Sequence, residues 1–256
     1  SEGFDDFSTA RCRISNGVVT IKFATSEVGQ GFTMLAQQIA RTVLGVDEVI
    51  LDTIDTQVGS AGSTSASRQT WMSGGAVQVA CQAALAQLFD HVATKFEMTR
   101  SELEIDGTDI VDRLTQRRVS VSDAISEIEI DCTEEYHHPP TEDLDENGQG
   151  NCHVAYAFVA HRAVVDVDPE LGLIKVVQIA TAQDVGRVLN PLAAMGQIEG
   201  GIAQGLGLAV MEEIIVKDDI DKFVFSSDEW IVMKDLDVFV EVRTTDHPAK
   251  IDSMVR

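Results

Sequence analysis

Alternating and helical patterns of apolar residues define the first elements of the chain. Apolar positions alternate with polar or small ones over Val18–Phe23, which predicts a strand entered through an Asn16-Gly17 turn. Over Phe32–Leu44 the apolar residues instead share one face at helical spacing, and Gly45 follows where a C-cap glycine is expected. Another strand is predicted at Val49–Thr56, so the segment has the order strand, helix, strand.

The same two patterns continue through the rest of the chain. A second helix is predicted around Val77–Val92, and its glutamines make the segment too polar for a membrane span. Tyr156–Val167 and Leu173–Ile179 are predicted strands joined by a tight turn. Asn190-Pro191 combines an N-cap residue with proline at the first helical position, which predicts a third helix running to about Glu213. Further strands are predicted near Lys222–Phe225 and Val238–Val242.

The order of these elements predicts a repeated architecture. Strand–helix–strand units occur around residues 18–56 and again around residues 152–225. They indicate an α+β fold with two lobes, the first over residues 1–130 and the second over residues 131–256. The segment Glu97–Glu146 carries 16 acidic and 4 basic residues, and we expect it to form surface strands and loops that join the lobes.

Composition and charge exclude several kinds of partner. The 256 residues include 19 Lys+Arg and 42 Asp+Glu, a net charge of −23, and 44% are hydrophobic. This balance is typical of a globular protein, while the acidic charge argues against nucleic acid and against anionic membrane surfaces. With no secretory signal and no apolar run long enough to span a bilayer, we expect a cytoplasmic protein.

Cysteines and histidines give no metal-binding pattern. The four cysteines are far apart and form no C-x-x-C pair, and the six histidines show no H-E-x-x-H spacing. No metal ligand is therefore predicted among the side chains, and a reducing compartment is the default for so few, dispersed cysteines. Cys81, on the apolar face of a predicted helix, is expected in the core.

Glycine gathers where charge is absent. Of 19 glycines, 12 fall in three windows, Glu27–Gly31, Gly59–Gly75 and Gly186–Gly207. Neutral, glycine-rich segments in an acidic protein mark places where the backbone approaches a ligand closely, although tight helix packing would also use them.

Each window places polar groups near the start of a helix or on one helix face. Gln30 stands between two glycines just before a predicted helix, and the loop Gly62–Gln69 offers four hydroxyls and a guanidinium before the next. Helix N-termini favour anions such as phosphate. Gln197, Gly201 and Gln204 share one face of the third helix, which suits a flat polar heterocycle. No standard nucleotide motif is present, so these residues alone predict a cleft for a large, polar, phosphate-bearing ligand.

At these windows the sequence resembles the molybdenum hydroxylases, the family of xanthine dehydrogenase and aldehyde oxidase. The similarity covers nearly the whole chain in consistent order, in the second half of the molybdopterin-binding subunit, and is closest to bacterial xanthine dehydrogenase molybdenum subunits. The segments that carry it are Glu27–Gly31, Ser63–Gln69, Gly74–Val77, Asp184–Gly186, Asn190-Pro191 and Gly196–Gly207.

The resemblance implies that the chain binds the molybdenum cofactor, as molybdopterin or its cytosine dinucleotide. Gln30 and Gln197 would then hydrogen-bond the pterin, and Gly31 belongs to the same motif as Gln30. A second set would line the pterin and its phosphate through backbone and hydroxyl groups: Ala66, Ser67, Arg68 and Gln69.

The resemblance also implies the activity and the partners. The family hydroxylates an electron-poor carbon of a small aromatic heterocycle or an aldehyde with water, and the electrons leave through 2Fe-2S clusters to FAD on partner subunits or domains. Oxidation of hypoxanthine and xanthine to urate is the expected reaction. The general-base glutamate is expected beyond Arg256, and the N-terminal half of the molybdenum-binding region is a further expected partner, so the chain alone should be inactive.

Several alternatives stay open at this point. Arg68 could contact the phosphate or pair with a neighbouring acid, and Trp71 could line a channel or simply pack. The enzyme could act on aldehyde, nicotinate or carbon monoxide instead of purines. A non-catalytic binding or assembly domain that has lost the cofactor is the alternative from another class.

Overall fold

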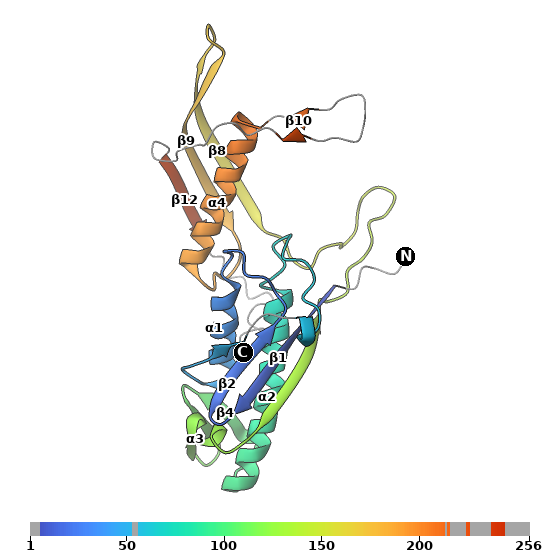
Figure 1. Cartoon of the computed structure of the whole chain (residues 1–256), viewed down its shortest axis with the longest axis vertical. Coiled ribbons are helices and arrows are strands. Elements are labelled where there is room, and N and C mark those ends of the chain that lie inside the picture. Colours follow the sequence, from blue (N-terminus) through green and yellow to red (C-terminus); the bar gives the residue numbers. More distant parts are fainter. Residues whose placement is uncertain (1–5, 53–55, 213, 216–223, 226–236, 244–256) are drawn as a thin grey trace. The chain divides into compact units, whose positions relative to one another are not determined.

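A computed structural model of the chain describes residues 6–52, 56–212, 214–215, 224–225 and 237–243 (Figure 1). Within this part of the chain, the helices and strands fall into two compact units, the first extending to Val154 and the second beginning at Ala155. Each unit has a sheet and at least one helix of its own.

The first unit is built on a four-stranded sheet with the strand order β3-β2-β1-β7. Strand β1 is antiparallel to both β2 and β7, and β3 is parallel to β2. A smaller sheet has the order β4-β5-β6. The elements of this unit are β1 (Phe7–Ser15), β2 (Val18–Phe23), α1 (Phe32–Leu44), β3 (Ile50–Leu51), η1 (Thr56–Val58), α2 (Met72–Phe96), η2 (Arg100–Glu102), β4 (Leu103–Asp106), β5 (Asp109–Asp112), β6 (Arg118–Ser120), α3 (Val121–Ile125) and β7 (Ile130–His137).

The hairpin that opens the first unit confirms the predicted turn and strand. Asn16 and Gly17 have φ values of 52° and 77°, the left-handed conformations that a tight turn of this kind requires, and Ser15 pairs with Val18. Inward positions on β1 and β2 are almost fully buried, which is the alternation expected of strands with one covered face.

The two long helices of the first unit cover its sheet. Helix α1 confirms the prediction for Phe32–Leu44, and Gly45 ends it at a φ of 67° with its N–H donated to the Arg41 carbonyl at 2.9 Å. Helix α2 lies against β1 and β7, and α1 packs beside α2 (Figure 1). The Phe23 and Phe32 rings meet edge to face with centroids 4.9 Å apart, which fixes α1 on β2. Within the described residues, no helix combines the length and the apolar character needed to cross a membrane.

Two expectations for the first unit differ from the structure. The strand predicted at Val49–Thr56 is reduced to the two residues of β3, and Thr56 begins η1 instead; residues 53–55 lie outside the described part. The first unit also extends beyond the boundary predicted at residue 130. Strand β7 pairs along β1 from Phe7 opposite His137 to Ile14 opposite Ile130, so part of the acidic segment completes the main sheet.

The second unit has a three-stranded sheet with the order β12-β9-β8. Strands β8 and β9 form an antiparallel hairpin, and β12 is parallel to β9. The Asn190 side chain accepts the Ala193 N–H at 3.0 Å, which confirms the predicted cap of α4, and this helix ends at Val210, before the predicted Glu213. The elements are β8 (Phe158–Asp168), β9 (Leu173–Asp184), α4 (Pro191–Val210), β10 (Ile214–Ile215), β11 (Val224–Phe225) and β12 (Asp237–Arg243).

The two units repeat one topology. In each, an antiparallel hairpin is followed by a helix and then by a strand parallel to the second strand of the hairpin. The strand orders β3-β2-β1 and β12-β9-β8 correspond position by position. The α+β class and the repeated strand–helix–strand unit are therefore confirmed, although the closing strand of the second copy is β12 and not the predicted strand near Phe225, which is β11 and pairs with β10.

A close contact between α2 and β7 gives a test of this packing. A Cβ atom on Gly75 would lie 2.7 Å from Cδ1 of the Tyr136 ring, so we expect Gly75→Ala to lower the free energy of unfolding by about 1–3 kcal/mol. Gly74→Ala is the control, because its nearest neighbour is the flexible Cδ1 of Ile39 at 3.3 Å. Thermal unfolding of the complete protein compares the two variants. Equal losses of stability in the two variants would contradict the predicted contact.

Candidate functional site

The loop between β2 and α1 is organised by the Glu27 carboxylate. Its Oε1 accepts the N–H groups of Gly29 and Gly31 at 2.9 and 3.0 Å, and its Oε2 accepts the N–H of Thr33 at 2.9 Å. Gly31, the N-cap of α1, has a φ of 87° and no side chain with which to cap the helix. Glu27 therefore supplies the missing acceptor for the first turn of α1.

The charge of Glu27 is suited to this position. Partial burial raises the pKa of its carboxyl, but the N–H donors of Thr33, Gly31 and Gly29 outweigh burial, so the pKa is lowered from its usual value. The ionised carboxylate also interacts favourably with the positive end of the helix dipole. The anion-favouring start of α1, proposed from the sequence as a place for phosphate, is thus filled by the chain's own carboxylate.

Gln30 folds back on the same loop. Its Oε1 accepts the Val28 N–H at 2.7 Å, and its Nε2 donates to the Ser26 carbonyl at 2.9 Å. A glutamine amide has two N–H donors and two acceptor lone pairs. One donor and one acceptor therefore remain for a group outside the loop.

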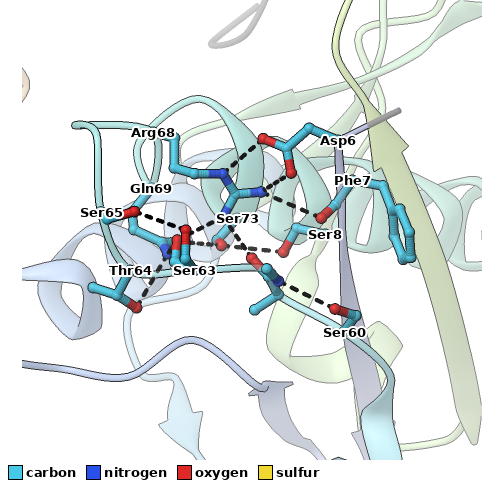
Figure 2. Close-up of polar contacts among 12 residues, drawn as sticks. Asp6, Phe7, Ser8, Ser60, Ser63, Thr64, Ser65, Arg68, Gln69 and Ser73 are labelled. Carbon is cyan, nitrogen blue, oxygen red and sulfur yellow. Dashed lines mark hydrogen bonds and ion pairs between the residues drawn. The ribbon is translucent and has the colours of Figure 1, made fainter. Parts of the chain in front are cut away.

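In the loop before α2, the Arg68 side chain pairs with an acid (Figure 2). Its Nε and Nη2 donate to the two carboxylate oxygens of Asp6 at 2.7 and 2.5 Å. Its Nη1 donates to the carbonyls of Ala61 and Ser63 at 2.6 and 2.9 Å. Of the two roles considered for Arg68, the structure shows the ion pair with a neighbouring acid.

Gln69 belongs to a buried network of hydroxyl and amide groups (Figure 2). Its Nε2 donates to the Ser63 carbonyl at 2.9 Å, and its Oε1 accepts the Ser73 hydroxyl. The Thr25 hydroxyl donates to Ser73 Oγ at 2.7 Å, and Ser8 Oγ lies 3.1 Å from the same atom. Gln69 and the three residues that bear these hydroxyls are all buried. The Gln69 side chain therefore ties the loop to α2 and β1 and does not face the solvent.

Ala66 and Ser67 form an exposed turn in this loop. Their φ values are 55° and 54°, left-handed conformations that cost a non-glycine residue about 1–2 kcal/mol each. Both residues are exposed, and neither backbone N–H has a hydrogen-bond partner within the described residues. Successive unpaired N–H groups in such a turn form a concave site for anions.

The N-terminus of α2 carries a further unpaired donor. Trp71 is half-buried at the N-cap, as expected of a packing residue, but its indole Nε1 is buried and makes no hydrogen bond within the described part of the chain. A buried donor without a partner is unfavourable, so a group beyond the described residues is expected to accept this N–H. Cys81, further along α2, is fully buried as predicted.

The third predicted set of residues lies on α4. Ile202 and Leu206 are buried, whereas Gln197, Gly201 and Gln204 are exposed on the opposite side of the helix. A Cβ atom on the following glycines would meet nothing within 4 Å in the described structure: Gly196, Gly200, Gly201 and Gly205. Packing within the described part of the chain therefore does not explain these glycines, each of which weakens a helix by about 1 kcal/mol relative to alanine.

The structure brings most of the predicted residues together. The loops containing Gln30 and Ser67 are in contact, since the Thr64 hydroxyl donates to the Ser26 carbonyl at 3.5 Å and Thr25 Oγ1 lies 3.4 Å from Gln69 Oε1. Both loops belong to the first unit. Gln197 belongs to the second unit.

Comparison with known proteins identifies the kind of domain. Residues 1–226 match the molybdopterin cofactor-binding domain family. The chain is 32% identical to a probable xanthine dehydrogenase subunit of Bacillus subtilis over 226 residues, which is 84% of this chain and 29% of that protein. It is 28% identical to the nicotine 6-hydroxylase large subunit of Paenarthrobacter nicotinovorans over 217 residues, which is 82% of this chain and 26% of that protein.

The fold agrees with solved structures of the same kind. Quinoline 2-oxidoreductase from Pseudomonas putida superimposes with a TM-score of 0.76 at 20% identity, over 94% of this chain and 32% of that one. The chain thus has the fold of a molybdopterin cofactor-binding domain and spans about a third or less of these proteins. It belongs to the molybdenum hydroxylase family.

Three features of the site were not predicted from the sequence. Glu27 stood in the family motif without a role, although a glycine N-cap with an acidic residue shortly before it was an available signal. Asp6 and the Ser8–Thr25–Ser73 hydroxyls come from distant segments, and nothing local to them indicated their partners.

The Glu27 contacts predict a pH dependence. Because the folded-state pKa is lowered, this stabilisation is complete above the ordinary glutamate pKa and is lost as the pH falls through the folded-state value. We expect Glu27→Gln to reduce the free energy of unfolding by about 1 kcal/mol at neutral pH and by less in acid. Denaturant titrations at several pH values measure the difference, with the exposed Glu104→Gln as the control. If Glu27→Gln lowered the free energy of unfolding by as much in acid as at neutral pH, the stabilising role of the ionised Glu27 carboxylate would be contradicted.

Proposed function

We propose that this chain holds the pterin and phosphate of the molybdenum cofactor in an enzyme that hydroxylates small nitrogen heterocycles, with xanthine and hypoxanthine as the first candidates. The observation that carries the proposal is the pair of adjoining loops in the first unit. One loop offers the spare donor and acceptor of Gln30, and the other offers the unpaired N–H groups of Ala66 and Ser67.

The residues present fit such a group. A pterin is a flat heterocycle rich in donors and acceptors, which glutamine amides complement without adding charge. Its phosphate suits consecutive backbone N–H groups. The exposed, glycine-rich face of α4 leaves room for the pterin to approach the helix backbone closely beside Gln197.

Each residue then has a defined task. Gln30 and Gln197 hydrogen-bond the pterin, Gly31 permits the left-handed turn that holds Gln30 before α1, and Ala66 and Ser67 bind the phosphate through their N–H groups. Arg68 and Gln69 line this region as supports of the loop. The cofactor would supply the two-electron centre for hydroxylation with water.

Two considerations support the substrate class and the partners. The names of two similar proteins specify xanthine and nicotine, both of which contain an aromatic nitrogen heterocycle, and both names denote subunits. We therefore propose partner subunits or domains that carry 2Fe-2S clusters and FAD, together with the other half of the molybdenum-binding region. All four cysteines are free, which supports a reducing, cytoplasmic location.

The first test is the molybdenum and pterin content of the complete protein, purified with its partner subunits. Near-stoichiometric molybdenum with pterin is the expected result, and turnover of xanthine in preference to nicotine, quinoline, an aldehyde or carbon monoxide would establish the purine substrate. Absence of both in a host that loads a related enzyme would contradict the proposal and favour a non-catalytic domain.

A second test addresses the glutamines. Gln30→Ala removes one side-chain donor and one acceptor for the pterin, and we expect at least a tenfold faster loss of pterin from the purified protein, because such hydrogen bonds contribute about 1–2 kcal/mol. Gln82→Ala is the matched control, since Gln82 is exposed on α2, away from the two loops. Equal pterin retention by the two variants would contradict the role of Gln30.

A further inference from the structure

The Arg68 guanidinium lies at the centre of the loop over residues 59–69, and we infer that it positions this loop and does not bind the cofactor itself. With Asp6 as its partner, it holds the loop in the shape in which Ala66 and Ser67 are exposed and their N–H groups have no hydrogen-bond partner within the described residues. This inference rests on the proposed function for the identity of the ligand. The pairing itself can be tested without the ligand.

Every donor of the guanidinium is already used. An arginine side chain has five N–H groups. Nε donates to Asp6, Nη1 to the carbonyls of Ala61 and Ser63, and Nη2 to Asp6 and to the Phe7 carbonyl at 3.3 Å. A phosphate could gain a hydrogen bond from Arg68 only by displacing one of these partners.

The charge of Arg68 is also neutralised. The Arg68 and Asp6 side chains are 12% and 25% exposed, so the pair is only partly accessible to water and its two fork-like hydrogen bonds are protected. A ligand approaching the loop therefore meets an ion pair with no net charge. Attraction of phosphate is left to the backbone.

The Arg68–Asp6 ion pair and the carbonyl contacts of Arg68, together called the Arg68 clamp, determine which backbone atoms the loop presents. The Ala61 and Ser63 carbonyl oxygens point at the guanidinium, which keeps two acceptors that would repel phosphate inside the loop. The Arg68 N–H donates to the Ser65 carbonyl at 3.3 Å and closes the turn that contains Ala66 and Ser67. Arg68 thus anchors the strained turn at its end, with both its main chain and its side chain.

The fit between Gly62 and Arg68 supports the same role. Gly62 has a φ of 63°, and a Cβ atom there would lie 2.8 Å from Nη2 of Arg68. The backbone approaches the guanidinium so closely that a side chain does not fit. The loop is therefore built around the arginine side chain.

The deciding experiment uses two conservative variants of the complete protein. Arg68→Lys keeps the positive charge but loses the paired Nε and Nη2 hydrogen bonds to the carboxylate of Asp6. Asp6→Asn leaves the arginine without its counterion. We expect each to lower molybdenum and pterin occupancy at least tenfold under mild gel filtration. If Arg68 bound the phosphate directly, Arg68→Lys would largely retain the cofactor and Asp6→Asn would retain it as well as the parent or better; either result would overturn the inference.

The matched control is an ion pair that joins two neighbouring strands of the same unit. Arg11 on β1 makes an ion pair with Asp131 on β7, but the two side chains are 40% and 46% exposed and lie outside the loop. We expect Arg11→Lys and Asp131→Asn to retain the cofactor. If these control variants lost as much cofactor as the Arg68 and Asp6 variants, the effect would be a general one of the substitution. That result would also overturn the inference.

Hydrogen exchange on cofactor-free protein separates this inference from the proposed function. The hydrogen-bonded amides of Gly62 and Arg68 in this loop should exchange at least tenfold faster in Arg68→Lys and Asp6→Asn, while α2 and β1 stay protected as in the parent. Unchanged exchange in the loop would refute the clamp, whatever the cofactor content. A parent protein without pterin but with faster loop exchange in the variants would refute the proposed function and leave the clamp standing.

Discussion

Buried polar atoms in an irregular loop need partners within the protein, and this constraint shapes the candidate site. Helices and strands satisfy only some carbonyl groups of the loop over residues 59–69. The Thr9 N–H of β1 donates to the Ser60 carbonyl at 2.7 Å, and the first N–H groups of α2 donate to the carbonyls of Arg68 and Gln69. Arg68 and Gln69 meet the need with side-chain donors directed inward. Once the carbonyls are satisfied from inside, the N–H groups of the turn are left for a ligand outside.

The same division of roles applies to the neighbouring loop, with the opposite charge. There the Glu27 carboxylate accepts the N–H groups before α1, as Arg68 donates to carbonyls before α2. Each charged side chain is engaged by hydrogen bonds, Glu27 with the N–H groups of its own loop and Arg68 with Asp6 and the carbonyls of its loop. Under the proposed function, amide and backbone groups are therefore the contacts left for the cofactor in a protein whose net charge is −23.

Local patterns in the sequence predicted the elements well, because the interactions that define them are local. The turn at Asn16, the helix ended by Gly45 and the cap at Asn190 depend on residues a few positions apart. By contrast, Asp6 and Arg68 are 62 positions apart, and the ion pair that joins β1 to β7 spans 120. Such pairs follow from the assembled sheet, which no pattern within one segment encodes, and for the same reason the predicted end of the first lobe came too early.

The glycines of α4 have a consequence for how the protein is assembled. Five of the twenty residues in this helix are glycine, which lowers its intrinsic stability by about 5 kcal/mol relative to alanine. A helix of that composition, with only Ile202 and Leu206 buried among its described contacts, depends on whatever covers its other face. Any group that covers this face, the cofactor among them under the proposed function, is therefore thermodynamically linked to the helical order of α4, so a protease that cleaves frayed helices would distinguish covered from uncovered protein.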